Sequence, residues 1–448
     1  MGGTSIAYSG LYSTNYVNPA SLTSIYLTTF EIGLKANLTR LETQQLKQKS
    51  SNAGLNYFSF AFPIKYKKWG TAFGLMPYSN VGYSFYYEDT GQDNVRQEHY
   101  FEGYGGVDQV FLSNAWSPFK GFSIGLNAAY LFGTTYDERR VEFSDRTYLN
   151  TRVIESINYG DFNFSGGLLF TKDSLKLSPS DSINFLNAKL NSIKDSLYAI
   201  DEILDELESR QDSASQVRKS EWEKQLAELS NEYERTFERK ANVKERKQRG
   251  DWSLSAGLTS SLSSDVSATQ NKVTESFKYF GGNIQVIDTI STVRSNKGII
   301  ELPFSYGVGL SMRKGNRWLF LADFSSQNWA QFTKFGEVDS LEDSWKISGG
   351  IQFTPNDRSL SNYLEVIQYR IGFRHEQTYL QLRNTALKEY ALTFGFGLPM
   401  RRVATTINLF GEFGRRGTTD NNLIEENFFR FGVGITINDR WFVRQKFD

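Results

Sequence analysis

The chain has 448 residues, 50 acidic and 50 basic side chains, and a mean hydropathy of −0.45. It contains no cysteine, which excludes disulfides and thiolate metal sites, and its balanced charge gives no sign of nucleic-acid binding. No run approaches the roughly eighteen apolar residues that a membrane-spanning helix needs, so helical membrane proteins are excluded as well.

The first predicted element, residues 1–24, is an irregular segment rich in residues that disfavour strand pairing. Gly2, Gly3 and Pro19 make regular pairing difficult, so we expect this segment to lie inside the barrel predicted below as a plug. The start shows neither a basic nor an apolar leader region, and we therefore expect that a signal peptide has been removed. Export to the bacterial outer membrane is inferred from this together with the strands.

Residues 25–172 show the period-two alternation of β-strands, with large apolar residues on one parity and small or polar residues on the other. From Trp69, apolar positions such as Phe73 and Phe85 alternate with Gly74 and Ser84. A soluble β-sandwich would also alternate, but its polar face would favour lysine, glutamate and threonine over these glycines. A barrel with a crowded lumen explains the glycines better, and we predict strands 1 to 6 of a transmembrane β-barrel here.

Residues 173–250 change to a three-four spacing of apolar residues, which predicts helices that pair through one apolar stripe. The first stripe comprises Ile183, Leu186, Leu190, Ile193, Leu197, Ile200, Leu204 and Leu207. The second comprises Trp222, Leu226, Leu229 and Tyr233. We predict an antiparallel, coiled-coil-like helical hairpin that follows the sixth strand and therefore lies in the periplasm. It is either a self-contained decoration or a docking arm, with Trp222 and Tyr233 as candidate partner-docking residues.

Residues 251–448 return to alternation and supply strands 7 to 14 and a C-terminal tail. In all we predict about fourteen antiparallel strands, an all-β transmembrane barrel with an N-terminal luminal plug and an inserted α-helical hairpin. The strands lie near Tyr26, Leu55, Trp69, Tyr100, Phe122, Ile154, Trp252, Ile300, Trp318, Trp345, Tyr369, Tyr390, Thr405 and Phe429. The segment around Tyr100 alternates poorly.

No catalytic constellation, metal spacing or phosphate loop is visible, and His99 and His375 stand alone on predicted strands. We therefore expect no enzyme activity, no cofactor and no metal. Several charged residues share parity with the small inner residues, and they predict a lumen that is filled or gated. These luminal charges are Glu31, Lys35, Arg370, Arg374, Glu376, Glu412 and Arg430.

Residues 1–7 (MGGTSIA), the motif Asn18, Pro19 and Ala20, and the closing residues 437–448 resemble the FadL-like outer-membrane β-barrel proteins of Bacteroidota. In that family the Asn-Pro-Ala motif belongs to a segment folded into the lumen of a fourteen-stranded barrel. The resemblance implies passive diffusion of fatty acids or other hydrophobic molecules past a mobile plug and through a lateral opening at a kinked third strand. Pro77, in the third predicted strand, is then the candidate lateral gate.

The helical hairpin departs from the usual pattern of that family, and two functions follow. One is passive uptake of hydrophobic small molecules. The other is a non-transporting structural or adaptor subunit of an outer-membrane protein complex for secretion or envelope assembly, because similar-looking barrels serve in such machines. The expected partners are membrane lipids, with either a hydrophobic solute or a periplasmic or outer-membrane protein, and no nucleic acid.

Overall fold

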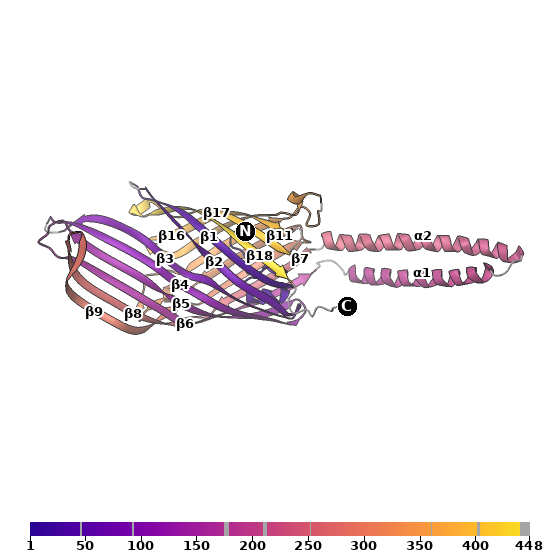
Figure 1. Cartoon of the computed structure of the whole chain (residues 1–448), viewed down its shortest axis with the longest axis horizontal. Helices are drawn as coiled ribbons and strands as arrows, with labels where there is room; N and C mark the ends of the chain where they lie inside the picture. The colour runs from indigo at the N-terminus through magenta and orange to yellow at the C-terminus, as the bar shows by residue number, and fades with distance from the viewer. Residues whose placement is uncertain are drawn as a thin grey trace. The chain divides into compact units, whose positions relative to one another are not determined.

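The structure is a computed structural model, which describes residues 1–44, 47–91, 94–173, 179–208, 213–250, 252–359, 361–400 and 404–439. The chain divides into two compact units. One comprises Met1–Thr171, Ser255–Ser311 and Phe320–Asp448, and the other comprises Lys172–Leu254 with Met312–Leu319. Figure 1 shows a barrel of long, tilted strands and a pair of helices.

Eighteen strand segments form one antiparallel sheet. Their bounds are β1 Thr28–Glu42, β2 Lys47–Lys65, β3 Trp69–Thr90, β4 Arg96–Phe119, β5 Phe122–Phe143, β6 Asn150–Asp173, β7 Trp252–Ser261, β8 Ser264–Phe280, β9 Asn283–Leu302, β10 Ser305–Lys314, β11 Trp318–Gln327, β12 Thr333–Lys334, β13 Glu337–Val338, β14 Ser344–Phe353, β15 Gln368–Leu382, β16 Thr385–Pro399, β17 Thr405–Gly417 and β18 Glu425–Asp439. Short 3₁₀ helices occur at η1 Pro19–Ser24, η2 Trp329–Gln331, η3 Tyr363–Glu365 and η4 Asp420–Asn422.

The sheet closes on itself because β18 pairs with β1 in an unbroken register from Thr28–Asp439 to Glu42–Glu425. Segments β7 and β8, β9 and β10, β11 and β12, and β13 and β14 each follow one another in a single crossing, so the barrel has fourteen strands. The predicted fold class and strand number are confirmed. Closure removes sheet edges, which is what allows strands to span a bilayer.

On β18 the two faces of the wall follow the predicted parity, whereas on β3 the prediction is wrong beyond Pro77, because the register shift between Pro77 and Ser79 turns Ser84 outward and Phe85 inward. On β18, Phe431, Val433 and Ile437 are exposed outward, whereas Gly432 and Thr436 are buried on the inner side. The outward row is apolar because it meets lipid, and the inner row is small because it meets other parts of the protein.

Val433→Arg tests this orientation. A guanidinium on the lipid face near the bilayer midplane is expected to destabilise the barrel by about 2 to 4 kcal/mol. Reversible urea unfolding in lipid vesicles would measure this. The control is Thr436→Ser on the inner face, for which we expect little change. Equal destabilisation by both variants would contradict the assignment.

Strands β3 to β6, β8 and β9 extend further than the rest (Figure 1). The outer portions of β4 and β5 together carry charged residues on both faces. On the outward face, Arg140 lies 2.9 Å from Glu142, 3.6 Å from Glu138 and 3.9 Å from Glu102. Such a row of charges is unfavourable in hydrocarbon, so this part of the sheet stands beyond the bilayer. The poor alternation near Tyr100 has the same cause, because both faces there meet water.

Helices α1 Pro179–Glu208 and α2 Ser213–Gly250 form an antiparallel hairpin, as predicted. Lys189 near the start of α1 pairs with Glu232 of α2 at 2.8 Å, and Glu208 at the end of α1 pairs with Lys219 at 2.5 Å. The hydrogen bond from Lys219 holds the pKa of Glu208 below its usual value. The α1 stripe is buried at Leu186, Leu190, Ile193 and Ile200. Neither helix, as far as it is described, carries an apolar stretch long enough to cross a bilayer.

Candidate luminal site and wall opening

The N-terminal segment is tied to the inner wall by Asn18, the first residue of the Asn-Pro-Ala motif. The Asn18 side chain accepts a hydrogen bond from the Ala20 amide at 3.1 Å and so caps η1. Its amide nitrogen donates to the Ile6 carbonyl at 2.7 Å and to the Leu168 carbonyl of β6 at 3.1 Å. The buried Asn18 side chain therefore stabilises the conformation of the N-terminal segment and also attaches the segment to the wall. Pro19 and Ala20 are also buried.

A second anchor is Asp323 of β11, which the sequence reasoning missed. Its Oδ2 accepts hydrogen bonds from the backbone amides of Ser5 at 2.5 Å and Ile6 at 2.9 Å. Asp323 shares its parity with the inward-facing Leu319 and Leu321, so strand parity was the signal that could have found it.

Glu31 of β1, a predicted luminal charge, is the third anchor. Its carboxylate accepts hydrogen bonds from the backbone amide and hydroxyl of Thr14 and, at 3.0 Å, from the hydroxyl of Thr436. The Thr14 hydroxyl also lies 2.8 Å from that of Ser59. A buried carboxylate satisfied by hydroxyls and an amide holds the segment against β1, β2 and β18.

Several wall glycines are required because the N-terminal backbone lies directly against them. A Cβ at Gly125 would stand 2.2 Å from the Ala20 nitrogen, and one at Gly167 would stand 2.1 Å from the Asn18 side-chain oxygen. Gly70, Gly257 and Gly372 meet the segment in the same way, each with a backbone atom 2.2 Å from the ideal Cβ. These glycines belong to different strands around the wall, so the segment they contact lies in the lumen.

Three of the remaining predicted luminal charges form a network across β15 to β18. Arg374 pairs with Glu389 and lies 3.0 Å from Glu412, and Arg430 lies 2.7 Å from Glu412 and 3.4 Å from Glu389. Arg416 joins it at 2.6 Å from Glu389. The sequence reasoning named Arg374, Glu412 and Arg430 but missed Glu389 and Arg416, which share the inward parity of their strands.

The other predicted luminal charges have different surroundings. Arg370 donates to the side-chain oxygens of Gln352 at 2.9 Å and Asn408 at 2.8 Å, and also to Gln368. Lys35 is half-buried, and Glu376 lines the cavity described below. Within the described ranges neither of these two residues forms an ion pair.

The wall splits between β2 and β3 at the position of Pro77. The β2–β3 ladder runs from Lys65–Trp69 to Phe58–Leu75. Beyond it, β2 pairs with β1, and β3 pairs with β4 with a register shift between Pro77 and Ser79. Proline cannot donate to a ladder, and a bulge turns the strand, so both features disfavour continued pairing with β2.

A cavity of about 430 Å³ lies inside the barrel beside this split. Met76, Phe111 and Ala129, with Tyr57 packed against them, form an apolar cluster that we call the seam cluster. The first three line the cavity next to the split, together with Gln109, the register partner of Met76. The rest of the lining is mixed, with Asn127, Asn163 and many serines beside Ile6, Val17 and Trp345.

Trp222 and Tyr233, the candidate docking residues, are both half-buried on the α2 stripe that faces α1. Among the described side chains of the hairpin, the most exposed aromatic ones are instead Tyr198, at 63%, and Phe237, at 55%. Phe237 stacks on Tyr233 with ring centroids 6.5 Å apart, and Lys194 lies over the Tyr198 ring.

Across the part of the chain that the structure describes, no three histidine or carboxylate side chains gather as a metal site. His99 stacks on Tyr87, and His375 stacks on Tyr390 at 4.4 Å.

The fold is that of FadL-type outer-membrane barrels. The Pseudomonas putida toluene transporter TodX superposes with a TM-score of 0.53 at 13% identity, over 98% of this chain and 97% of that one. A TodX deletion mutant, described as a monoaromatic hydrocarbon channel, gives 0.55 at 15% identity over the same shares. A Pseudomonas aeruginosa FadL homologue gives 0.50 at 8% identity, again over 98% and 97%. The predicted resemblance in fold is confirmed.

The family model described as BamG matches residues 1–237 and 205–448, which together span the chain. The chain belongs to the BamG family. A search of curated proteins found no match.

Proposed function

We propose that the protein is an outer-membrane channel for passive uptake of hydrophobic small molecules, with lateral passage at the β2–β3 split. The observation that carries this proposal is the seam cluster. It gives the cavity apolar side chains at the one place where β2 and β3 separate, beside Pro77. A cavity of this size suits a small molecule, and its polar side chains suit a head group such as a carboxylate. The toluene-transporting neighbours support the same class of solute.

The N-terminal segment acts in this proposal as a plug. Hydrogen bonds hold this segment to the wall, made by Asn18 of the segment and by Asp323 and Glu31 of the wall. Each bond stabilises the attached segment by about 0.5 to 3 kcal/mol. A few such bonds can be exchanged as the solute passes, so the plug can move without unfolding the wall.

Filling the cavity beside the split tests the channel. Ala129→Phe, on the inner face of β5, is expected to reduce the initial rate of oleate uptake about tenfold in cells whose chromosomal copy has been deleted. Ala128→Phe is the matched control, because its side chain lies on the lipid face of the same strand. Equal uptake with and without the protein would refute the channel.

A second function, that of a structural or adaptor subunit, is favoured by the hairpin. Its apolar stripes are satisfied between α1 and α2, yet Tyr198 and Phe237 stay exposed on helices that the barrel does not need for closure. In this proposal the hairpin lies in the periplasm and binds a protein partner. Deleting residues 182–247 should leave oleate uptake intact but remove a stoichiometric partner from the detergent-purified protein. If the same proteins co-purify with the full chain and with the deletion variant, the hairpin does not have this role.

A further inference from the structure

The split in the wall produces two free strand edges, and they differ in composition. From Lys47 to Gly54 the β2 edge reads KQKSSNAG, and every one of these residues is exposed. Lysines and small polar residues are the means by which proteins protect an edge from further pairing. The β2 edge therefore has the composition of a strand that remains in water.

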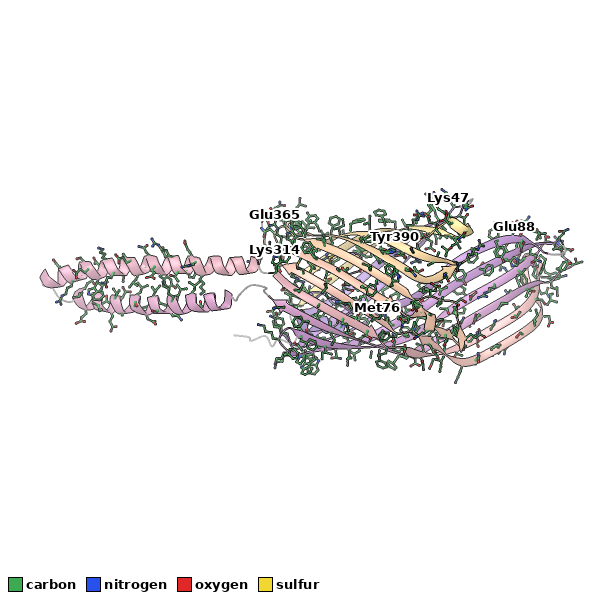
Figure 2. All side chains as sticks on the ribbon, turned by 180° about the vertical axis from the view of Figure 1, so that it is seen from behind. Lys47, Met76, Glu88, Lys314, Glu365 and Tyr390 are labelled. Carbon is green, nitrogen blue, oxygen red and sulfur yellow. The ribbon has the colours of Figure 1, made fainter. Side chains whose placement is uncertain are left out.

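The β3 edge has the opposite character. Residues 79–90 read SNVGYSFYYEDT, pair only with β4 among the described strands, and contain no lysine and no proline. Tyr83, Phe85, Tyr86 and Tyr87 are 39%, 48%, 62% and 48% exposed. Figure 2 labels Lys47 on β2 and Glu88 on β3, both towards the right-hand end of the barrel in that view.

The β3 aromatic side chains are already ordered by their neighbours on β4. Phe85 stacks on Phe101 at 5.0 Å and Tyr87 on His99 at 4.6 Å on one face, while Tyr86 stacks on Tyr100 at 5.6 Å on the other. These ladders stop at β3, so a further strand would extend them on both faces. Cross-strand aromatic pairs are among the favourable contacts of a sheet.

The location also matters, because Ser84 and Tyr86 lie in register with the outward charge row of Glu102, Glu138 and Arg140. The part of β3 from Ser84 to Thr90 therefore stands beyond the bilayer, and a partner would reach it from water. It lies at the barrel end opposite to that at which β6 ends, since Phe170 at the end of β6 pairs with Phe122 at the start of β5.

We propose that residues 79–90 of β3 bind an extended segment of another protein, which adds to the sheet as an antiparallel strand with aromatic or β-branched side chains. This mode of recognition takes affinity from main-chain hydrogen bonds and specificity from alternate side chains. A second copy of this chain does not fit. In one membrane both copies of β3 would run in the same direction and could pair only in parallel, whereas β3, β4 and β5 of this sheet all pair antiparallel.

Photo-crosslinking in native membranes tests the proposal. With p-benzoylphenylalanine in place of Tyr83, Phe85 or Tyr87, we expect crosslinks to a single partner segment. The attached partner residues should be two apart and in reverse order, as an antiparallel ladder requires. The same probe in place of Gln48, on the β2 edge, should give none. Crosslinks only to lipid or glycan, only to a second copy, without this order, or absent altogether would overturn the proposal.

A charge variant provides the second arm. Phe85→Lys combined with Tyr87→Lys gives β3 the composition of a protected edge, and the crosslink from position 83 should fall about tenfold. The matched control, Gln48→Lys combined with Ser50→Lys, should leave it unchanged. Heat-modifiable gel mobility verifies that each barrel is folded. An undiminished crosslink in a folded Phe85, Tyr87 double variant would contradict strand addition.

Discussion

Glu389→Ala is expected to destabilise the barrel by about 3 to 5 kcal/mol, because it leaves three luminal guanidinium groups without their shared carboxylate. Glu389 is almost fully buried, with a side chain 3% exposed, and its partners Arg374, Arg416 and Arg430 come from three other strands. Removing one partner of a buried ionic network costs more than the network contributes, since Arg374, with a side chain 15% exposed, stays largely desolvated.

Urea unfolding of the folded barrel, followed by tryptophan fluorescence, would measure this effect. Glu376→Ala is the control, because Glu376 lies on the neighbouring strand at the same register but forms no ion pair within the described residues. We expect the control to change stability by less than about 0.5 kcal/mol. Similar losses in both variants would show that the network contributes nothing specific.

Ile193→Asp is expected to unfold the hairpin while the barrel remains folded. Ile193 is 5% exposed in the stripe between α1 and α2, and loss of such a side chain costs about 2 to 5 kcal/mol before the charge is counted. Ile193 lies between Leu190 and Ile200 in this buried stripe, so a carboxylate at this position interrupts the contact between the helices. The hairpin and the barrel belong to different compact units, so the effect should stay local.

Hydrogen exchange on the full chain gives the readout. In Ile193→Asp, amides of residues 186–204 and 222–236 should lose protection, while those of β15 to β18 keep it. Ser196→Asp places the same charge on an exposed position one turn away and should change neither set. Loss of protection in the strands as well would mean that the two units fold as one.

The sequence by itself determined the strand number, the two faces of regular strands such as β5 and β18, and the helical hairpin. Alternation with a period of two placed Val433 outward and Thr436 inward, because each strand residue has only two faces to choose from. The three-four spacing from Leu186 to Ile200 predicted the helices in the same way, because it depends only on residues that are close together in the sequence. These features needed no knowledge of which strands are neighbours.

Only the tertiary structure decided what the inner faces do. Parity marks Asp323, Glu389 and Arg416 as inward, but it does not say that Asp323 accepts the Ser5 and Ile6 amides or that Glu389 lies among three arginines. Those contacts join residues up to several hundred positions apart, and the closure and register of the barrel set them. The same holds for the β2–β3 split. In the sequence, Pro77 indicates an irregular strand. Only the register shows that the β2–β3 ladder ends at Phe58–Leu75 and leaves the aromatic edge of β3 unpaired. A strand has a free edge only where its neighbour stops pairing with it, and the sequence of the strand itself does not contain that information.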